Sequence, residues 1–229
     1  LIRAHVEKHA TRVWTDPIGN LMAYKKGTEG KKHVLLAAHM DEVGFMVLGI
    51  NDNGLLSYEP VGGIDARVVV SKPVLVGEKE VPGVIGAKAI HLQTRAEFEK
   101  VLKHEDLYID IGAKSREEAE AAVTLGDRVS FAQNYARFGE GFVRAKALDN
   151  RLGCAFLLEL LLSESEYSFT GAFTVQEENG CIGAKAAAGS EDYALVMVDQ
   201  ENNVWISGSL RGNFEPHETD ADYTYIYID

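Results

Sequence analysis

The feature that most constrains the fold is a set of three apolar runs, each of which leads into ionisable side chains. The runs cover residues 33–38, 169–175 and 193–198. Strands that are buried on both faces have continuous apolar sequences of this kind, whereas half-exposed strands alternate. The ionisable residues that follow the three runs are His39, the pair Glu177 and Glu178, and Asp199. The pattern predicts a buried sheet whose polar groups gather where the strands end.

Helices are predicted around these strands. Residues 152–162 are apolar on nearly every face of a helix, and such a helix must lie between a sheet and another layer. At the start of the chain, residues 1–10 have the spacing of a short amphipathic helix, and residues 13–25 have that of a hairpin. The alternation predicts an α/β fold, with a mostly parallel sheet flanked by helices. Ligands of such sheets bind at the carboxyl ends of the strands.

The character of the sequence changes after Gly62. Short β-prone runs follow one another, separated by glycine, proline and charged residues, which is typical of a small barrel. We therefore predict an inserted β-rich barrel domain over residues 63–142. Residues 1–62 and 143–229 would form one discontinuous catalytic domain. Ser115 is expected to cap a short helix within the insert.

Composition limits the function. The chain has 229 residues, 46% of them apolar, which is enough for a sizeable core. A formal charge of −12 argues against a nucleic-acid partner and suits cations, although a negative surface also simply keeps a protein in solution. No apolar run approaches the ~18 residues of a membrane span, so no membrane partner is expected. The two cysteines lack C-x-x-C spacing, which favours reduced thiols in the cytoplasm.

The ionisable residues at the strand ends form a candidate metal site. His39, Glu177, Glu178 and Asp199 would share one rim of the sheet with Asp149, which precedes the apolar helix. A histidine with several carboxylates suits Zn²⁺, Co²⁺ or Mn²⁺, and more than three carboxylates exceed the need of one divalent ion. Two metal ions are therefore expected. A water held between two such ions becomes a nucleophile near neutral pH, so hydrolysis is the implied reaction.

Each of these residues also has a simpler interpretation. His39 could be an ordinary hydrogen-bonded histidine, although Asp41, two residues later, is the kind of partner that orients a ligating imidazole. Asp149 could belong to a helix N-terminal cap. Asp199 could be a turn former. The adjacent glutamates are hardest to dismiss, because a carboxylate beside a buried strand is costly unless it is neutralised or coordinated.

Six segments in order along residues 1–200 resemble the M42 family of dinuclear metal aminopeptidases, whose members have often been labelled endoglucanases. The family includes the tetrahedral and glutamyl aminopeptidases. The segments are Ala38–Phe45, Pro60–Asp65, Gly83–Gly86, Leu107–Ala113, Ala145–Gly153 and Thr174–Gly180. Six motifs in register make a chance match improbable. The resemblance implies removal of N-terminal residues from short peptides within a large homo-oligomer, often a dodecamer, whose inserted domain serves subunit assembly.

The resemblance also implies roles for individual residues. The implied metal ligands are His39, Asp149, Glu178, Asp199 and His217. Asp149 would bridge the two ions, and His217 is the histidine left to complete the second metal site, in a context that differs from that of the family. Glu177 would be the general base. Asp41 would orient a ligand, and the Asp149–Asn150 peptide bond would be cis.

A second hypothesis comes from a different class of protein. Residues 201–229 do not match the sequence of the family, and the second metal site depends on them. The alternative is therefore a non-catalytic or metal-deficient homologue that keeps the fold for assembly or binding. The number of metal ions per chain would distinguish the two hypotheses.

Overall fold

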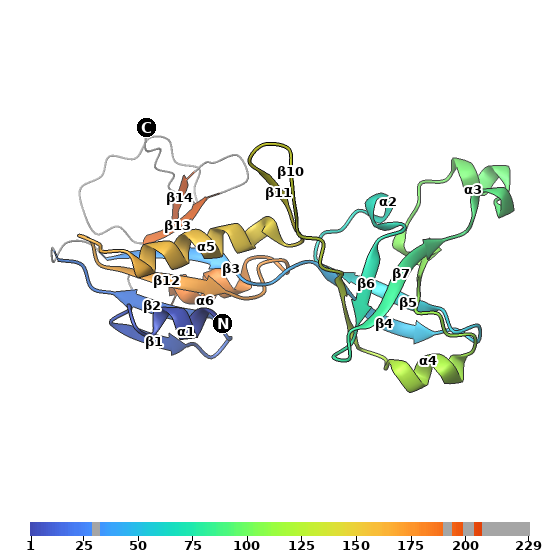
Figure 1. Ribbon diagram of the computed structural model, residues 1–229, viewed down its shortest axis with the longest axis horizontal. Coiled ribbons are helices and arrows are strands. Elements are labelled where there is room, and N and C mark those ends of the chain that lie inside the picture. Colours follow the sequence, from blue (N-terminus) through green and yellow to red (C-terminus); the bar gives the residue numbers. More distant parts are fainter. Residues whose placement is uncertain (29–32, 190–193, 199–203, 208–229) are drawn as a thin grey trace. The chain divides into compact units, whose positions relative to one another are not determined.

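The computed structural model describes residues 1–28, 33–189, 194–198 and 204–207 (Figure 1). The chain forms two compact units. The first combines residues 1–41 with residues 148–229, and the second covers residues 42–147. Each unit has a sheet and a hydrophobic core of its own.

The first unit contains a six-stranded mixed sheet in the order β1-β2-β12-β3-β13-β14. Only the pairs β12–β3 and β3–β13 are parallel among the described strands. The prediction of a mostly parallel sheet was therefore wrong, because β1, β2 and β14 all join by antiparallel pairing. The bounds are Arg12–Thr15 (β1), Leu21–Lys25 (β2), Phe169–Thr174 (β12), Val34–His39 (β3), Ala194–Val198 (β13) and Val204–Ser207 (β14).

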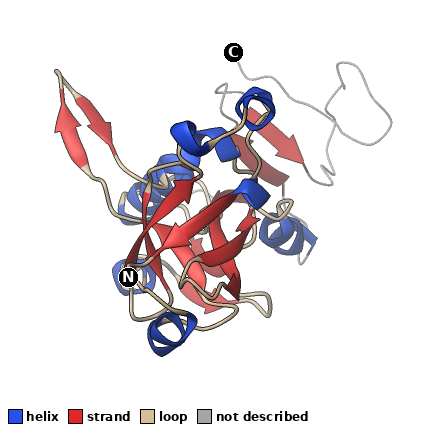
Figure 2. Cartoon of the chain, turned by 90° about the vertical axis from the view of Figure 1, so that its right-hand side faces the viewer, coloured by secondary structure: helices blue, strands red, loops and turns tan. Residues whose placement is uncertain are grey.

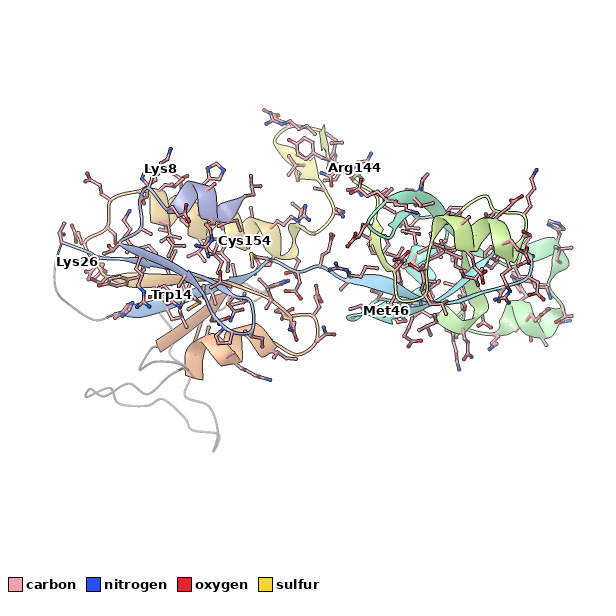
Figure 3. The ribbon with its side chains drawn as sticks, turned by 90° about the horizontal axis from the view of Figure 1, so that it is seen from below. Lys8, Trp14, Lys26, Met46, Arg144 and Cys154 are labelled. Atoms are coloured by element: carbon pink, nitrogen blue, oxygen red, sulfur yellow. The ribbon has the colours of Figure 1, made fainter. Side chains whose placement is uncertain are left out.

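Helices pack on both faces of this sheet, as predicted. Helices α1 (Ile2–Val6) and α5 (Leu148–Leu162) share a core with one face, and α6 (Ile182–Gly189) packs on the other. The side chains of β12 alternate between these cores, so Phe173 faces α5 while Ala172 faces α6. Cys154 is one of the α5 residues that is buried against the sheet (Figure 3).

The second unit is built on a closed antiparallel barrel in the order β4-β5-β8-β7-β6-β9, closed by pairing of β9 with β4 (Figure 2). The predicted insert of residues 63–142 therefore began too late. Strands β4 and β5, which were predicted to belong to the catalytic domain, complete the barrel through pairing with β9 and β8. The bounds are Gly44–Ile50 (β4), Leu56–Val61 (β5), Pro73–Val76 (β6), Val81–Ala87 (β7), Leu107–Asp110 (β8) and Arg128–Phe131 (β9).

Short elements connect the barrel strands. Ser115 caps α4 as predicted, since its Oγ accepts a hydrogen bond from the Glu118 N–H at 3.3 Å. The connecting elements are α2 (Ala66–Val69), η1 (Ile90–Leu92), α3 (Arg95–Glu99), η2 (His104–Asp106) and α4 (Arg116–Ala122). A separate hairpin of β10 (Ala136–Phe138) and β11 (Phe142–Arg144) follows the last barrel strand. Among the helices that the structure describes, none has the length and apolar character needed to cross a membrane.

Candidate metal centre

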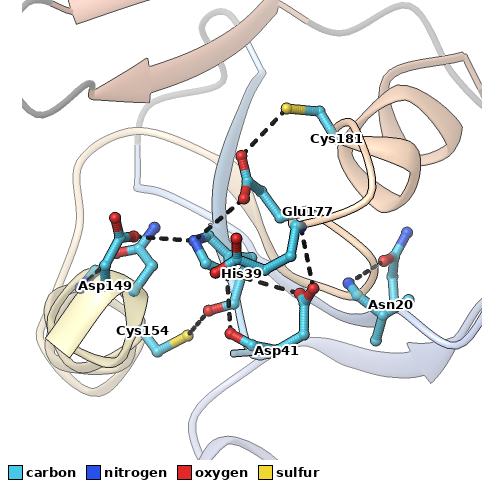
Figure 4. A network of polar contacts seen from close by, with 11 residues as sticks. Asn20, His39, Asp41, Asp149, Cys154, Glu177 and Cys181 are labelled. Atoms are coloured by element: carbon cyan, nitrogen blue, oxygen red, sulfur yellow. Dashed lines mark hydrogen bonds and ion pairs between the residues drawn. The ribbon is translucent and has the colours of Figure 1, made fainter. Parts of the chain in front are cut away.

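The pairing of β3 with β12 brings the two predicted acidic segments together. In this parallel pair His39 lies opposite Thr174, so both strands end at the same rim of the sheet. The chain that continues from Thr174 therefore passes beside the His39 ring and carries Glu177 and Glu178 (Figure 4). His39 is buried, with 6% of its surface exposed.

Both ring nitrogens of His39 face oxygen atoms. Nδ1 lies 3.1 Å from the backbone carbonyl oxygen of Asp41, which can only accept, so we assign the ring proton to Nδ1. Nε2 then faces carboxylates, with Asp149 Oδ1 at 3.0 Å and Glu177 Oε2 at 3.7 Å. A neutral imidazole has no second proton to donate to these oxygens. The ring therefore needs either a second proton or a cation at Nε2.

The donor set and its spacing fit a divalent transition metal. One ligand atom each from His39, Glu177 and Glu178 lie within 4.8 Å of one another. Ligands of a tetrahedral zinc ion lie about 3.4 Å apart, given bond lengths of about 2.0–2.2 Å. The two Nε2–oxygen distances of 3.0 and 3.7 Å lie on either side of this value. A nitrogen and several carboxylate oxygens are ligands that Zn²⁺, Co²⁺ and Mn²⁺ accept.

The electrostatics of the acidic residues support a cation at this place. Burial is the main cause that raises the pKa of Glu178, and the charge of the neighbouring Glu177 raises it further. Asp41 accepts the Glu178 backbone N–H through Oδ2 at 3.2 Å, while its buried Oδ1 has no hydrogen bond among the described residues. That oxygen lies 3.6 Å from His39 Nδ1, on the side of the ring opposite the Glu177 carboxylate.

The backbone around the cluster adopts conformations that most residues avoid. A turn forms at Asn179-Gly180, with the N–H groups of Gly180 and Cys181 both donating to the Glu177 carbonyl oxygen at 2.8 Å. Gln176 and Cys181, on either side of it, have positive φ angles of 57° and 58°. Such residues concentrate where function constrains the backbone. The Asp149–Asn150 peptide bond is cis, as the resemblance implied.

Two thiols contact the cluster without entering the candidate ligand set. Cys154 donates from Sγ to the His39 carbonyl oxygen at 3.1 Å, and burial raises its pKa to about 11, so it stays protonated. Cys181 lies 3.3 Å from Glu177 Oε1, and burial followed by this hydrogen bond raises its pKa. Both cysteines are free, and each anchors one part of the cluster.

The structure brings together five of the predicted residues: His39, Asp41, Asp149, Glu177 and Glu178. Asp199 and His217 lie outside the described residues. Sequence reasoning missed the two thiols, because a lone cysteine in an apolar context carries no spacing signal. It also covered Asn20 only within the predicted hairpin of residues 13–25. This polar residue directly precedes the apolar segment Leu21-Met22-Ala23, which is a signal from which burial of its side chain could have been predicted.

The chain combines a mixed sheet, which has helices on both faces, with a barrel unit and a histidine–carboxylate cluster at the strand ends. These features define a class of protein: an α/β protein with a candidate metal site. The profile of the M42 glutamyl aminopeptidase family matches residues 19–201. The chain therefore belongs to this family.

Individual relatives agree with this. The putative aminopeptidase FrvX of Escherichia coli is 38% identical over 189 residues, which are 80% of this chain and 52% of that protein. Aminopeptidase APDkam598 of Desulfurococcus kamchatkensis superposes with a TM-score of 0.76 at 34% identity, over 85% of this chain and 54% of the other. The TET1 peptidase of Pyrococcus horikoshii, described as assembling into a tetrahedron or an octahedral shell, gives 0.74 at 37% identity, over 84% and 59%. The chain thus spans little more than half the length of these relatives.

Proposed function

We propose that this protein is a metal-dependent aminopeptidase that removes N-terminal residues from short peptides at a dinuclear metal site. The observation that carries the proposal is the convergence of two carboxylates on His39 Nε2, whose other ring nitrogen faces a carbonyl oxygen. Family membership supplies the reaction class.

The candidate ligands divide between two ions. His39 and Glu178 would each hold one ion, and Asp149, whose side chain is 61% exposed, would bridge the two. Asp199 and His217 are the proposed remaining ligands. When bound, the ions would acidify a water molecule and polarise the scissile carbonyl group. Zn²⁺ and Co²⁺ suit the donor set best, and Mn²⁺ is also compatible.

Glu177 is the proposed general base. Its side chain is 36% exposed, so it can meet a substrate, and the Cys181 thiol donates to its Oε1 while Oε2 faces His39. The thiol hydrogen bond at Oε1 restrains the orientation of the carboxylate and leaves Oε2 available, which suits a base that takes a proton from water and passes it to the leaving amine. Asp41 keeps the His39 ring in place.

Homo-oligomeric assembly, in the manner of the dodecameric shells of the family, is part of the proposal. The TET1 structures support it, as does a group of exposed apolar side chains on the barrel unit, each more than 60% exposed: Ile90, Leu92, Phe98 and Val101. Light scattering on the purified protein tests this. We also propose a cytoplasmic location, supported by the two free cysteines.

The test of function is hydrolysis of aminoacyl chromogenic substrates by purified protein with added Co²⁺ or Zn²⁺. Turnover that disappears with a chelator and returns with metal supports the proposal. Two bound ions per chain without turnover on any of a panel of aminoacyl groups would instead favour the non-catalytic homologue, as would one ion or none.

A further inference from the structure

The segment that carries Glu177 and Glu178 leaves the sheet and returns to it through a narrow neck. Val175 follows β12, and Gly183 lies in the first turn of α6. The Gly183 N–H donates to the Val175 carbonyl oxygen at 3.0 Å, which closes the neck. A Cβ atom on Gly183 would lie 2.1 Å from that same oxygen, so only glycine allows this approach.

The remaining polar groups of the neck are satisfied by one side chain from a distant part of the chain. Asn20 Oδ1 accepts the Val175 N–H at 3.0 Å, and Asn20 Nδ2 donates to the Gly183 carbonyl oxygen at 2.8 Å. The Asn20 amide therefore links the two sides of the neck, Val175 and Gly183, through hydrogen bonds to their backbone groups. Its orientation follows from its partners, since one end meets a donor and the other an acceptor.

Asn20 is itself held in place. Its side chain is fully buried, and Nδ2 also donates to Asp16 Oδ2 at 2.7 Å. The other oxygen of Asp16 accepts the backbone N–H groups of Ile18, Gly19 and Asn20 at 3.2, 2.9 and 2.8 Å. A buried amide with both of its N–H bonds and its oxygen in use is rigid.

We propose that Asn20 is a positioning residue that sets where Glu177 and Glu178 stand relative to His39, and through them the affinity for metal. The proposal rests on the proposed metal site. Val175 is separated from Glu177 by a single residue, Gln176, whose positive φ of 57° leaves little freedom for adjustment. A shift at the neck would therefore also displace the two carboxylates. Figure 4 shows where Asn20 and Glu177 lie within the same network.

The test uses Asn20→Asp. This substitution keeps the acceptor for the Val175 N–H but places a second carboxylate oxygen against Gly183 and Asp16, where two N–H donors stood. We expect metal affinity, measured by calorimetric titration of metal-free protein with Zn²⁺, to fall about 10–100-fold, as for other residues that orient metal ligands. Amide hydrogen exchange at Val175 and Glu178 should accelerate in the metal-free protein. If Asn20→Asp does not fold, Asn20→Ser, which removes the span across the neck without adding charge, takes its place.

Thr170→Val is the matched control. Thr170 is also fully buried and polar, but lies near the opposite end of β12, where its Oγ1 contacts His33 Nε2 at 2.8 Å. Its loss should destabilise the sheet while leaving metal affinity within about twofold of the original. A second control separates stability from positioning. Substitutions elsewhere that restore the stability of Asn20→Asp should not restore its metal affinity.

The outcomes separate this inference from the proposed function. Faster exchange at Val175 with weaker Zn²⁺ binding supports the positioning role. Unchanged exchange, or faster exchange with unchanged affinity, overturns it. If the original protein binds no Zn²⁺ at all, the proposed metal site fails, and the positioning role falls with it, while exchange at Val175 still reports whether Asn20 holds the neck.

Discussion

Each unit of the chain contains carboxylates with shifted pKa values, and the shifts of Asp65 and Glu97 in one unit are opposite in direction to that of Glu178 in the other. In the barrel unit, Asp65 pairs with Arg67 and Glu97 with Lys88, and these hydrogen bonds lower each carboxyl pKa to about 2. In the sheet unit, Glu178 has its pKa raised by burial and by Glu177. Asp65 and Glu97 are thus neutralised by cations of the same unit. The strand-end cluster gathers like charges, an arrangement that a bound cation would stabilise.

The largest expected effect is on the chemistry of the cluster. Glu177→Gln removes the proposed base but keeps the shape of the side chain. We expect kcat on an aminoacyl chromogenic substrate to fall by about 10²–10⁴-fold, the usual contribution of a general base. Zn²⁺ affinity should change little. Retention of turnover by this variant would show that Glu177 is not the base.

The next effect separates binding from stability. Because the folded-state pKa of Glu178 is raised, its ionised form is disfavoured in the metal-free protein, and this cost grows as pH rises through that pKa. Glu178→Gln should therefore leave the free energy of unfolding in chelator at pH 7 unchanged or increased, as measured in urea. Metal affinity should fall by more than about 100-fold, beyond the range for residues that only orient ligands. A destabilised apo-protein with normal affinity contradicts this assignment.

A substitution at the neck between Val175 and Gly183 should lower the free energy of unfolding. Gly183→Ala places a Cβ atom 2.1 Å from the Val175 carbonyl oxygen, and overpacking of this kind costs about 1–3 kcal/mol. Urea unfolding measures the loss. Gly189→Ala, in the same helix, is the control, since a Cβ there meets no atom within 4 Å. Equal stability of the two variants would mean that the neck adjusts freely.

The smallest effect lies in the barrel unit. The folded-state pKa of Glu97 is lowered from 4.5 to about 2, chiefly by Lys88, so its contribution is present above pH 4.5 and lost as pH falls toward 2. Glu97→Gln should flatten the acid side of the Tm–pH curve slightly, because the pair is exposed and screened. Glu140→Gln, in the exposed β10–β11 turn, serves as control. An unchanged slope would show that the pair has no net effect.

Much of the cluster was predictable because position in a strand is a local signal. The continuous apolar runs that precede His39 and Glu177 identified buried strands, and the ends of adjacent parallel strands must meet. The direction of the neighbouring strands was harder to predict from the sequence. Nothing in the sequence of residues 21–25 distinguishes an antiparallel neighbour of β12 from a parallel one.

The domain boundary and the role of Asn20 depend on long-range contacts. Strands β4 and β5 have an ordinary hairpin pattern, and only their pairing with β9 and β8 assigns them to the barrel. Asn20 lies 155 residues before Val175. The segment Asp16-Pro17-Ile18-Gly19-Asn20 has the residue types of a turn, so the presence of Asn20 there is already accounted for without any distant partner. The hydrogen bonds of Asn20 to Val175 and Gly183 can be recognised only in the folded structure.

The most direct test of the account is metal binding at His39. Metal-free protein would be titrated with Co²⁺, and binding would be monitored by calorimetry and by visible absorption. The same titration would be carried out on His39→Ala and on the control His33→Ala, whose substituted residue directly precedes β3 at the end opposite His39. We predict saturable binding that His33→Ala preserves. His39→Ala should weaken it by more than about 100-fold, beyond the effect of losing a residue that only orients a ligand. Equal Co²⁺ binding by His39→Ala and the original protein, or no binding by either, would contradict this prediction.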